Sequence, residues 1–258
     1  MTTALVTGST AGIGAEFARQ LAARGDDLVL VARDQRRLAA QAQELAARYG
    51  VRCEVLPADL AVRADIDAVA ARLASADAPV DVLVNNAGFG FTTTLLDADT
   101  AELERALDVM ALAPMLLGGA AGRAMASRGR GTIITVASLA AWIAQGGYSA
   151  VKSFARVWSE GLAGELAGTG VTVTVLCPGW VTTEFHERAG LDGQARSIPG
   201  PVWVSAERCV REALADADRG KVVSIPTTRW KLAAFALQHL PRGVVHAISR
   251  RLSKAKQG

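Results

Sequence analysis

Residues 4–14 read ALVTGSTAGIG, a short apolar run that leads straight into a turn rich in glycine. The apolar run predicts a β-strand, and Gly8, Gly12 and Gly14 predict a tight turn into a helix. Glycines let a phosphate group approach the backbone closely, and the free N–H groups and dipole of a helix N-terminus favour an anion. The spacing differs from GxGxxG, and no lysine follows the last glycine as a P-loop requires. The stretch therefore predicts a strand, turn and helix that hold the pyrophosphate of a dinucleotide.

The alternation of strand and helix continues along the chain. Short runs rich in β-branched residues predict strands, and the alanine-rich stretches between them predict helices. Near-continuous apolar strands separated by helices indicate a parallel sheet with helices on both faces, and right-handed crossovers make it a Rossmann-like, doubly wound α/β sheet of about seven strands. The expected strands are 4–7, 27–32, 52–57, 80–85, 131–137, 171–177 and 221–226, and the expected helices include 12–24, 34–48, 62–75, 100–127 and 148–167.

Length and composition predict one α/β domain over residues 1–258. Half of the 258 residues are hydrophobic, which is enough to bury a sizeable core. Cys53, Cys177 and Cys209 lie far apart with no paired spacing, so we expect buried free thiols in a reducing compartment. With no basic, cleavable leader and no run of about 18 apolar residues, the sequence predicts a cytoplasmic protein that does not span a membrane. The longest stretch without clear periodicity, 182–204, predicts a mobile substrate lid.

The net charge of +3 is unevenly distributed. Nine of the 28 Lys and Arg residues, and none of the 25 acidic residues, lie from Arg219 onward, so residues 1–218 carry a formal charge of −6. This acidic body shows no basic face or motif for nucleic acid. Residues 228–258 predict a C-terminal extension of two basic amphipathic helices broken at Pro241. The extension either packs against the lid or another subunit, or docks on an anionic membrane.

The ends of the following strands carry further binding residues, because ligands of such sheets bind beyond the carboxyl ends of the strands. Ala32 stands where an acid would read the 2′-hydroxyl of NAD(H), and Arg33 follows it directly. A guanidinium can hold a 2′-phosphate, which favours NADP(H) over NAD(H). Asp34 is the competing reader of a ribose, but we interpret it as the N-cap of the next helix. Beyond the next two strands lie Asp59–Leu60, expected beside the adenine, and the stretch NNAG at 85–88.

Five motifs, in order and spacing across nearly the whole chain, resemble the short-chain dehydrogenase/reductase family. They are TGxxxGIG at 7–14, NNAG, a serine at the end of the fifth strand, YxxxK at 148–152 and PGxxxT at 178–183. The resemblance implies an oxidoreductase that transfers hydride between a nicotinamide and a carbonyl or secondary alcohol, and that assembles as a homodimer or homotetramer. It implies Ser138, Tyr148 and Lys152 as catalytic residues. It implies cofactor contacts from Gly8, Thr10, Gly12, Ile13, Gly14, Arg33, Asp59, Leu60, Asn86, Ala87, Gly88, Tyr148, Lys152, Pro178, Gly179, Val181 and Thr183.

The chemistry explains why a phenol and an amine stand four positions apart. That spacing places Tyr148 and Lys152 on one face of a helix. Carbonyl reduction needs a proton donor at the oxygen, and a free phenol with a pKa of about 10 is a poor donor and base near neutral pH. We expect Lys152 and the positive charge of the oxidised nicotinamide to lower that pKa. Ser138 is expected to orient the carbonyl oxygen.

Two departures from the family pattern bear on catalysis. Ser138 and Tyr148 are ten residues apart where most members have thirteen, which predicts a reshaped pocket. Met110 stands where the family carries an Asn that holds a water in the proton relay, and a thioether is at best a weak acceptor. Both Asn residues of the chain lie in NNAG. The alternative function is therefore a redox-responsive, dinucleotide-binding module with little turnover.

The residues around the expected mouth favour an apolar substrate. Core packing explains any single one of them equally well, but together they predict a lipophilic acyl, steroid or terpenoid-like compound. The three histidines, His186, His239 and His246, lack metal-ligand spacing, so no metal is expected. The expected mouth residues are Phe89, Phe91, Leu139, Trp142, Trp180, Phe185 and Trp203.

Overall fold

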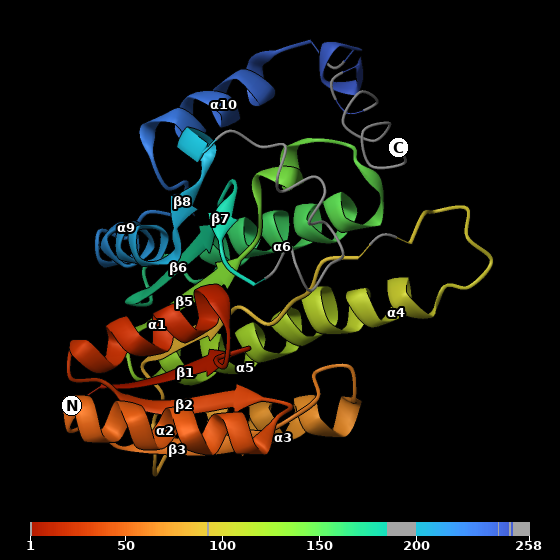
Figure 1. The fold of residues 1–258 in the computed structure, drawn as a ribbon. Helices are drawn as coiled ribbons and strands as arrows, with labels where there is room; N and C mark the ends of the chain where they lie inside the picture. Colours follow the sequence, from red (N-terminus) through yellow and green to blue (C-terminus); the bar gives the residue numbers. More distant parts are fainter. Residues whose placement is uncertain (1, 92, 185–199, 242, 248, 250–258) are drawn as a thin grey trace.

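The computed structural model of this chain describes residues 2–91, 93–184, 200–241, 243–247 and 249, and within these it has a seven-stranded parallel sheet at its centre (Figure 1). The strand order β3-β2-β1-β4-β5-β6-β9 confirms the predicted doubly wound, Rossmann-like fold. Because the chain returns to the middle of the sheet after β3, the ends of β1 and β4 lie side by side at the switch point. The strands are β1 Thr3–Thr7, β2 Asp27–Ala32, β3 Cys53–Pro57, β4 Val82–Asn85, β5 Gly131–Val136, β6 Val171–Leu176 and β9 Val223–Ser224.

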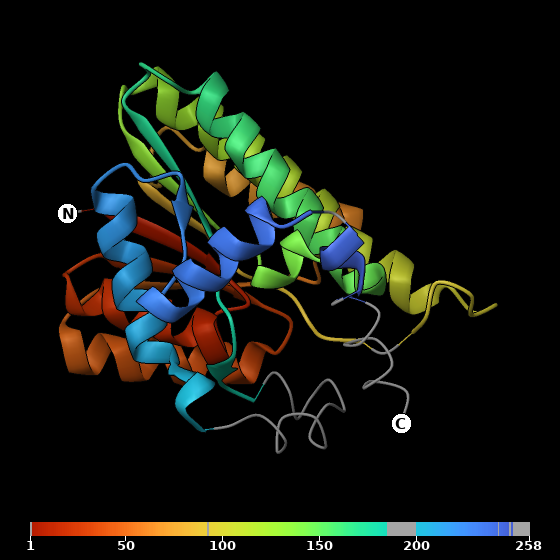
Figure 2. The same ribbon diagram turned by 90° about the horizontal axis from the view of Figure 1, so that it is seen from above.

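Helices cover both faces of the sheet (Figure 2). Helices α1 (Gly12–Ala23), α2 (Gln35–Tyr49) and α9 (Ala206–Asp218) bury apolar side chains such as Phe17, Leu38 and Val210 against one face. Helices α3 (Arg63–Ala74), α5 (Ala113–Ser127) and α6 (Gly146–Glu165) bury Ile66, Leu117 and Val151 against the other. These apolar stripes recur at helical spacing, which is why sequence periodicity predicted most of these helices.

The stretch Ala101–Ser127 is long and apolar enough to cross a membrane, by length and composition alone. It comprises α4 (Ala101–Leu107), a π-helical turn η1 (Asp108–Leu112) and α5. Its most apolar window is 61% buried inside the protein, and α5 packs beside α3 against one face of the sheet. Packing in the core therefore accounts for its apolar sequence.

The C-terminal part departs most from the sequence predictions. Helix α9 was not among the expected helices, whereas α10 (Thr228–His239) ends just before Pro241 as expected, and residues 243–247 are helical again. The two ends of the expected lid pair with each other, through β7 (Val181–Thr182) and β8 (Val204–Ser205). Residues 185–199, the middle of that lid, lie outside the described residues. The three cysteines are free thiols; Cys177 and Cys209 are buried, whereas Cys53 is only partly so.

Candidate active site

The glycine turn at the end of β1 has a shape that only glycine allows. Gly8 and Gly12 have φ angles of +64° and +53°, in the left-handed region. A Cβ on Gly14 would lie 2.2 Å from the carbonyl oxygen of Gly8 and 2.3 Å from Nδ2 of Asn86. The turn therefore brings bare backbone to the N-terminus of α1, where a pyrophosphate can approach.

The NNAG stretch after β4 holds this turn in place. Asn86 Nδ2 donates to the carbonyl oxygens of Thr7 (2.9 Å) and Gly8 (3.2 Å). The Thr7 hydroxyl accepts from the backbone N–H groups of Asn86 (2.9 Å) and Ala87 (3.1 Å). The Asn86 amide thus stabilises the turn through these hydrogen bonds, a role that the family resemblance did not specify. On the other side, a Cβ on Gly12 would lie 3.3 Å from Thr183, so the PGxxxT segment also packs against the turn.

The ribose end of the site carries more positive charge than Arg33 alone. Arg33 is exposed just beyond β2, and Asp34 is the N-cap of α2, with its carboxylate 3.0 Å from the N–H groups of Arg36 and Arg37. The Asp34 interpretation is confirmed. The Arg37 guanidinium donates to the carbonyl of Thr10 at 3.1 Å, which joins the start of α2 to the glycine turn. Sequence reasoning missed Arg37, although three arginines within residues 33–37 were the available signal.

The adenine end is anchored by an arginine from a distant helix. Arg105 of α4 donates through one nitrogen to both carboxylate oxygens of Asp59, at 2.9 Å each. Burial by itself would raise the pKa of Asp59. The hydrogen bonds of the carboxylate and the charges of Arg105 and Arg33 outweigh this effect, so the pKa is lowered overall. The side chains of Leu60 and Val181 are buried in the core, so contacts with a cofactor at these two positions would come from the backbone.

The expected catalytic residues meet at the end of β5. Tyr148 and Lys152 lie in the first two turns of α6, with Nζ of Lys152 5.7 Å from the centre of the phenol ring. Ser138 caps the 3₁₀ turn η2 (Leu139–Trp142), and its hydroxyl hydrogen-bonds with the Tyr148 phenol. Lys152 Nζ donates to the carbonyl of Val136 at 3.1 Å. A phenol, an amine and a hydroxyl therefore lie close together at the end of β5, beside Gly88.

Among the groups of the protein itself, burial has the largest effect on the pKa of Tyr148, whereas the expected lowering relies on Lys152 together with the charge of the oxidised nicotinamide. Burial raises the pKa of Tyr148 to about 12, and the hydrogen bond with Ser138 offsets only part of that. Burial also lowers the pKa of Lys152 to about 8, opposed by nearby Cys177. Low-dielectric surroundings disfavour both charged forms, and the ammonium is directed to Val136. An added positive charge is needed to favour the phenolate.

Met110 lies beside this cluster in a distorted part of the helix. It is 2% exposed and belongs to the π-helical turn η1, a type of distortion that is frequent at functional sites. A Cβ on Gly88 would lie 3.0 Å from the Met110 sulfur and 3.7 Å from Lys152 Nζ, so Gly88 leaves room for both. Four residues on stands Pro114, which has no N–H to bond the Met110 carbonyl as a regular helix would. We therefore expect the Met110 carbonyl to serve as an acceptor that does not depend on the side chain.

The aromatic residues expected at the mouth divide into two groups. Phe91 makes an edge contact with the Tyr148 ring at 6.1 Å between centres, and Phe89 lies 6.1 Å from Phe91. Trp180 and Trp203 pack edge to face at 5.4 Å, across the paired strands β7 and β8. Phe91 is itself buried in the core, so the assignment of these four residues to a substrate mouth stays a prediction, and Phe185 lies outside the described residues.

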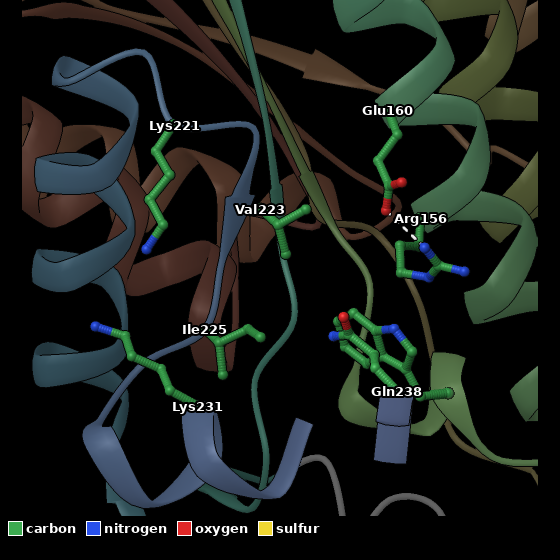
Figure 3. A pocket seen from close by; sticks show the side chains of 8 residues that line it. Arg156, Glu160, Lys221, Val223, Ile225, Lys231 and Gln238 are labelled. Atoms are coloured by element: carbon green, nitrogen blue, oxygen red, sulfur yellow. Dashed lines mark hydrogen bonds and ion pairs between the residues drawn. The ribbon is translucent and has the colours of Figure 1, made fainter. Parts of the chain in front are cut away.

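Leu139 and Trp142 do not line this mouth, and their assignment to it was wrong. Leu139 is buried in a core cluster with Val175 and Cys177. Trp142 packs under the Arg156 guanidinium and lines a separate cavity beside β9 (Figure 3). The 3₁₀ turn η2 after Ser138 directs both side chains away from Tyr148. Among the described residues, no group of three or more His, Cys, Asp or Glu could hold a metal.

Comparison with known proteins agrees with this geometry. The family model of the short chain dehydrogenases matches residues 2–192. Galactitol 2-dehydrogenase (L-tagatose-forming) of Cereibacter sphaeroides is 37% identical over 70% of this chain and 72% of its own. A short-chain dehydrogenase from Sphingobium yanoikuyae in complex with NADPH superposes with a TM-score of 0.82 at 36% identity, over 92% of this chain and 94% of that one.

A second solved structure is the bulky-bulky ketone specific alcohol dehydrogenase from Comamonas testosteroni. It has a TM-score of 0.79 at 30% identity, over 92% of each chain. The parallel sheet with helices on both faces agrees with the fold of these neighbours, and the family match covers most of the chain. The chain therefore belongs to the short-chain dehydrogenase/reductase family of oxidoreductases, which act on alcohol and carbonyl groups.

Proposed function

We propose that this protein is an NADP(H)-dependent oxidoreductase that interconverts an apolar carbonyl compound and the corresponding secondary alcohol. The convergence of Ser138, Tyr148 and Lys152 beside Gly88 carries the proposal, because Gly88 belongs to the NNAG segment that braces the expected dinucleotide turn.

The residues present fit a nicotinamide dinucleotide. A side chain on Gly14 would fill the space against the backbone of Gly8, so that the turn remains open to a pyrophosphate only with glycine there. Lys152, beside Gly88, lies where it would hold the nicotinamide ribose. When bound, the cofactor supplies the hydride and, in its oxidised form, a positive charge. The chain's own groups supply the proton and the orientation.

In reduction, the Tyr148 hydroxyl would give its proton to the carbonyl oxygen, and a bound nicotinamide would supply the hydride for the carbonyl carbon. A pKa of about 12 keeps the phenol protonated at neutral pH, which is the form that reduction uses. Ser138 orients the carbonyl through its hydroxyl. Alcohol oxidation needs the phenolate, and Lys152 together with a cationic nicotinamide supplies the charge that favours it.

A preference for NADP(H) is supported by the arginines after β2. Arg33 and Arg36 are exposed, and Arg37 bonds the glycine turn, so cationic side chains surround the position of a 2′-phosphate. Ala32 provides no carboxylate for a 2′-hydroxyl. The Sphingobium relative is described in complex with NADPH.

An apolar substrate is supported by this chain's own side chains. Phe91 contacts the Tyr148 ring, Phe89 packs on Phe91, and the Trp180 and Trp203 pair belongs to the segments that follow β6. The named relatives act on both a sugar alcohol and bulky ketones, so their names alone favour neither class. The aromatic lining favours lipophilic acyl, steroid or terpenoid-like carbonyls.

A homodimer or homotetramer is proposed as the assembly. Helix α6 exposes Phe154 (39%) and Val157 (56%) on the face away from the sheet, an apolar surface that a second copy would cover. Light scattering after size-exclusion chromatography measures the assembly, and a monomer at micromolar concentration would contradict this part of the proposal.

The central experiment titrates NADPH and NADH by fluorescence and then screens a panel of ketones for NADPH oxidation. Arg33→Ala is expected to weaken NADPH binding by about 1–3 kcal/mol and to leave NADH binding nearly unchanged. Arg48→Ala, near the C-terminus of α2, is the matched control. Equal affinity of the wild type for both cofactors would contradict the assignment of Arg33. Tight binding without turnover of any carbonyl would favour the alternative, a binding module.

A further inference from the structure

Helix α10 presents an apolar ridge to solvent. Leu232 is 66% exposed and Phe235 61%, and the two lie one turn apart on the outer face. The His239 ring stacks on Phe235 with 3.9 Å between ring centres and extends the ridge by another turn. The outward face of a helix in an ordinary domain is polar, so this ridge requires an explanation.

The opposite face of α10 shows that this orientation is fixed by packing. Ala234 is 1% exposed in a cluster with Cys177 and Ile225. The indole of Trp230 packs against Gly179 so closely that a Cβ there would lie 2.1 Å from the ring. The helix therefore cannot rotate its ridge inward without losing these contacts.

Positive charge borders the ridge on both sides. Arg229 and Lys231 are exposed, and the helical repeat places them on opposite flanks of the line from Leu232 to Phe235. From Arg219 onward the chain carries nine Lys and Arg residues and no acid, whereas the preceding 218 residues carry −6. Long cationic side chains beside an exposed apolar stripe are typical of helices that lie in the plane of an anionic membrane surface.

A cavity of about 330 Å³ adjoins the Lys231 flank, between α6, β9 and α10. Lys221 and Lys231 stand on one side of it and the ion pair of Arg156 with Glu160, 2.6 Å long, on the other (Figure 3). Lys221 also lies 3.4 Å from the carboxylate of Asp216. The remaining wall includes Val223, Ile225, Trp142 and Gln238. Three cations against one lining carboxylate suit a compact anion such as a lipid phosphate.

We propose that the ridge of Leu232, Phe235 and His239, with its flanking cations and the adjoining cavity, docks the protein on a membrane that contains anionic phospholipids. The ridge enters the boundary between headgroups and acyl chains, and Lys231, Lys221 and Arg156 face headgroup phosphates. Because Trp230 packs on Gly179 of the PGxxxT segment, docking holds the substrate side of the protein near the lipid. The inference goes beyond the proposed function and does not depend on turnover.

The test is co-sedimentation of the full chain with vesicles of phosphatidylcholine, alone or mixed with phosphatidylglycerol. Binding is expected only to the mixed vesicles and is expected to fall as salt rises. Lys231→Glu reverses one charge beside the surface, and Leu232→Ser combined with Phe235→Ser removes the apolar ridge, so each change should weaken binding by about tenfold or more. Arg48→Glu and Val62→Ser are the matched controls at the opposite end of the molecule, near α2 and α3 (Figure 1). The altered side chains of the ridge are largely exposed, and an unchanged NADPH titration confirms that each variant is folded.

Three results would overturn the proposal. The first is absence of binding to the mixed vesicles at low salt. The second is a ridge variant that changes the oligomeric state and leaves vesicle binding unchanged, because a second copy then covers the ridge. The third is calorimetric binding of inorganic phosphate, abolished by Lys231→Glu, in a protein that ignores vesicles, because the cavity then serves a free anion.

Discussion

The two ends of the active site are built by different physical means. At the cofactor end, the backbone is packed so tightly that a single Cβ on Gly14 would approach a carbonyl oxygen to 2.2 Å. At the substrate end, Lys152 Nζ lies 5.7 Å from the Tyr148 ring centre, and burial of these two groups sets their pKa values. Steric exclusion governs the backbone shape of the cofactor end, and the low dielectric of a buried site governs the pKa values at the substrate end. Mutations at the cofactor end should therefore weaken cofactor binding, whereas mutations at the substrate end should slow proton transfer.

The largest expected effect is at the substrate end. Tyr148→Phe removes the proton donor, so turnover of a ketone should fall by at least about 100-fold, within the usual range for general acid catalysis. NADPH affinity should stay within about twofold, because the hydroxyl acts on the reacting oxygen. Steady-state kinetics and fluorescence titration measure the two quantities, with Tyr49→Phe, at the end of α2, as the matched control. A cofactor-saturated, folded Tyr148→Phe enzyme with near wild-type turnover would refute the mechanism.

Lys152 tests the role of burial through the pH dependence of stability. Burial lowers its pKa from 10.5 to about 8, so in this range the unfolded chain binds more protons than the folded one. The free energy of unfolding of the wild type, relative to Lys152→Met, should rise by about 3 kcal/mol between pH 8 and pH 10.5, since each pKa unit is worth about 1.4 kcal/mol. Below pH 8 the difference should be flat. Denaturant melts of both proteins without cofactor measure it, and a constant difference over pH 8–10.5 would show that Lys152 is not desolvated.

Glycine substitutions test the cofactor end. Gly14→Ala should lower stability by about 1–3 kcal/mol, the range for overpacking, and should weaken NADPH binding because the turn must shift. Gly161→Ala on α6, where a Cβ would meet nothing within 4 Å, should instead stabilise the protein by up to about 1 kcal/mol. Thermal melts and NADPH titrations compare the two. If Gly14→Ala binds NADPH like the wild type, steric exclusion does not govern this end.

The smallest effect is expected at Met110. Because Pro114 supplies no N–H, the Met110 carbonyl can accept from a relay water whichever side chain the residue carries, so Met110→Asn should change turnover by less than about threefold. Pro114→Ala restores the N–H that would occupy this carbonyl and should lower turnover more than Met110→Asn does. Solvent-isotope effects and pH profiles on both variants check the assignment. A large gain in turnover for Met110→Asn would show that the side chain limits the relay.

Sequence reasoning succeeded for features that depend on residues close together in the chain. The apolar strands, the glycine turn, the Asp34 cap and the one-turn spacing of Tyr148 and Lys152 are all readable within a few residues, and the structure places each as expected. It failed where a side chain's direction depends on a turn. The 3₁₀ turn η2 after Ser138 sends Trp142 toward α10 and not toward the mouth.

Long-range partners were equally invisible to sequence reasoning. Arg105 meets Asp59 across 46 positions, and Asn86 braces a turn that lies 78 positions earlier. No local sequence pattern marks either side chain as having such a distant partner. Contacts of this kind follow from the order of strands in the sheet, which brings the ends of β1 and β4 together.

By itself, the sequence determined the doubly wound sheet and the glycine turn, because each depends on local periodicity or glycine content, whereas the expected catalytic residues came from the resemblance to a family. Only the tertiary structure decided the electrostatics of Tyr148 and Lys152, the π-helical setting of Met110 and the exposed ridge on α10. These depend on which surfaces the packed elements cover: burial opposes charge on the phenolate and the ammonium, and the contacts of Trp230 and Ala234 leave Leu232 and Phe235 facing outward.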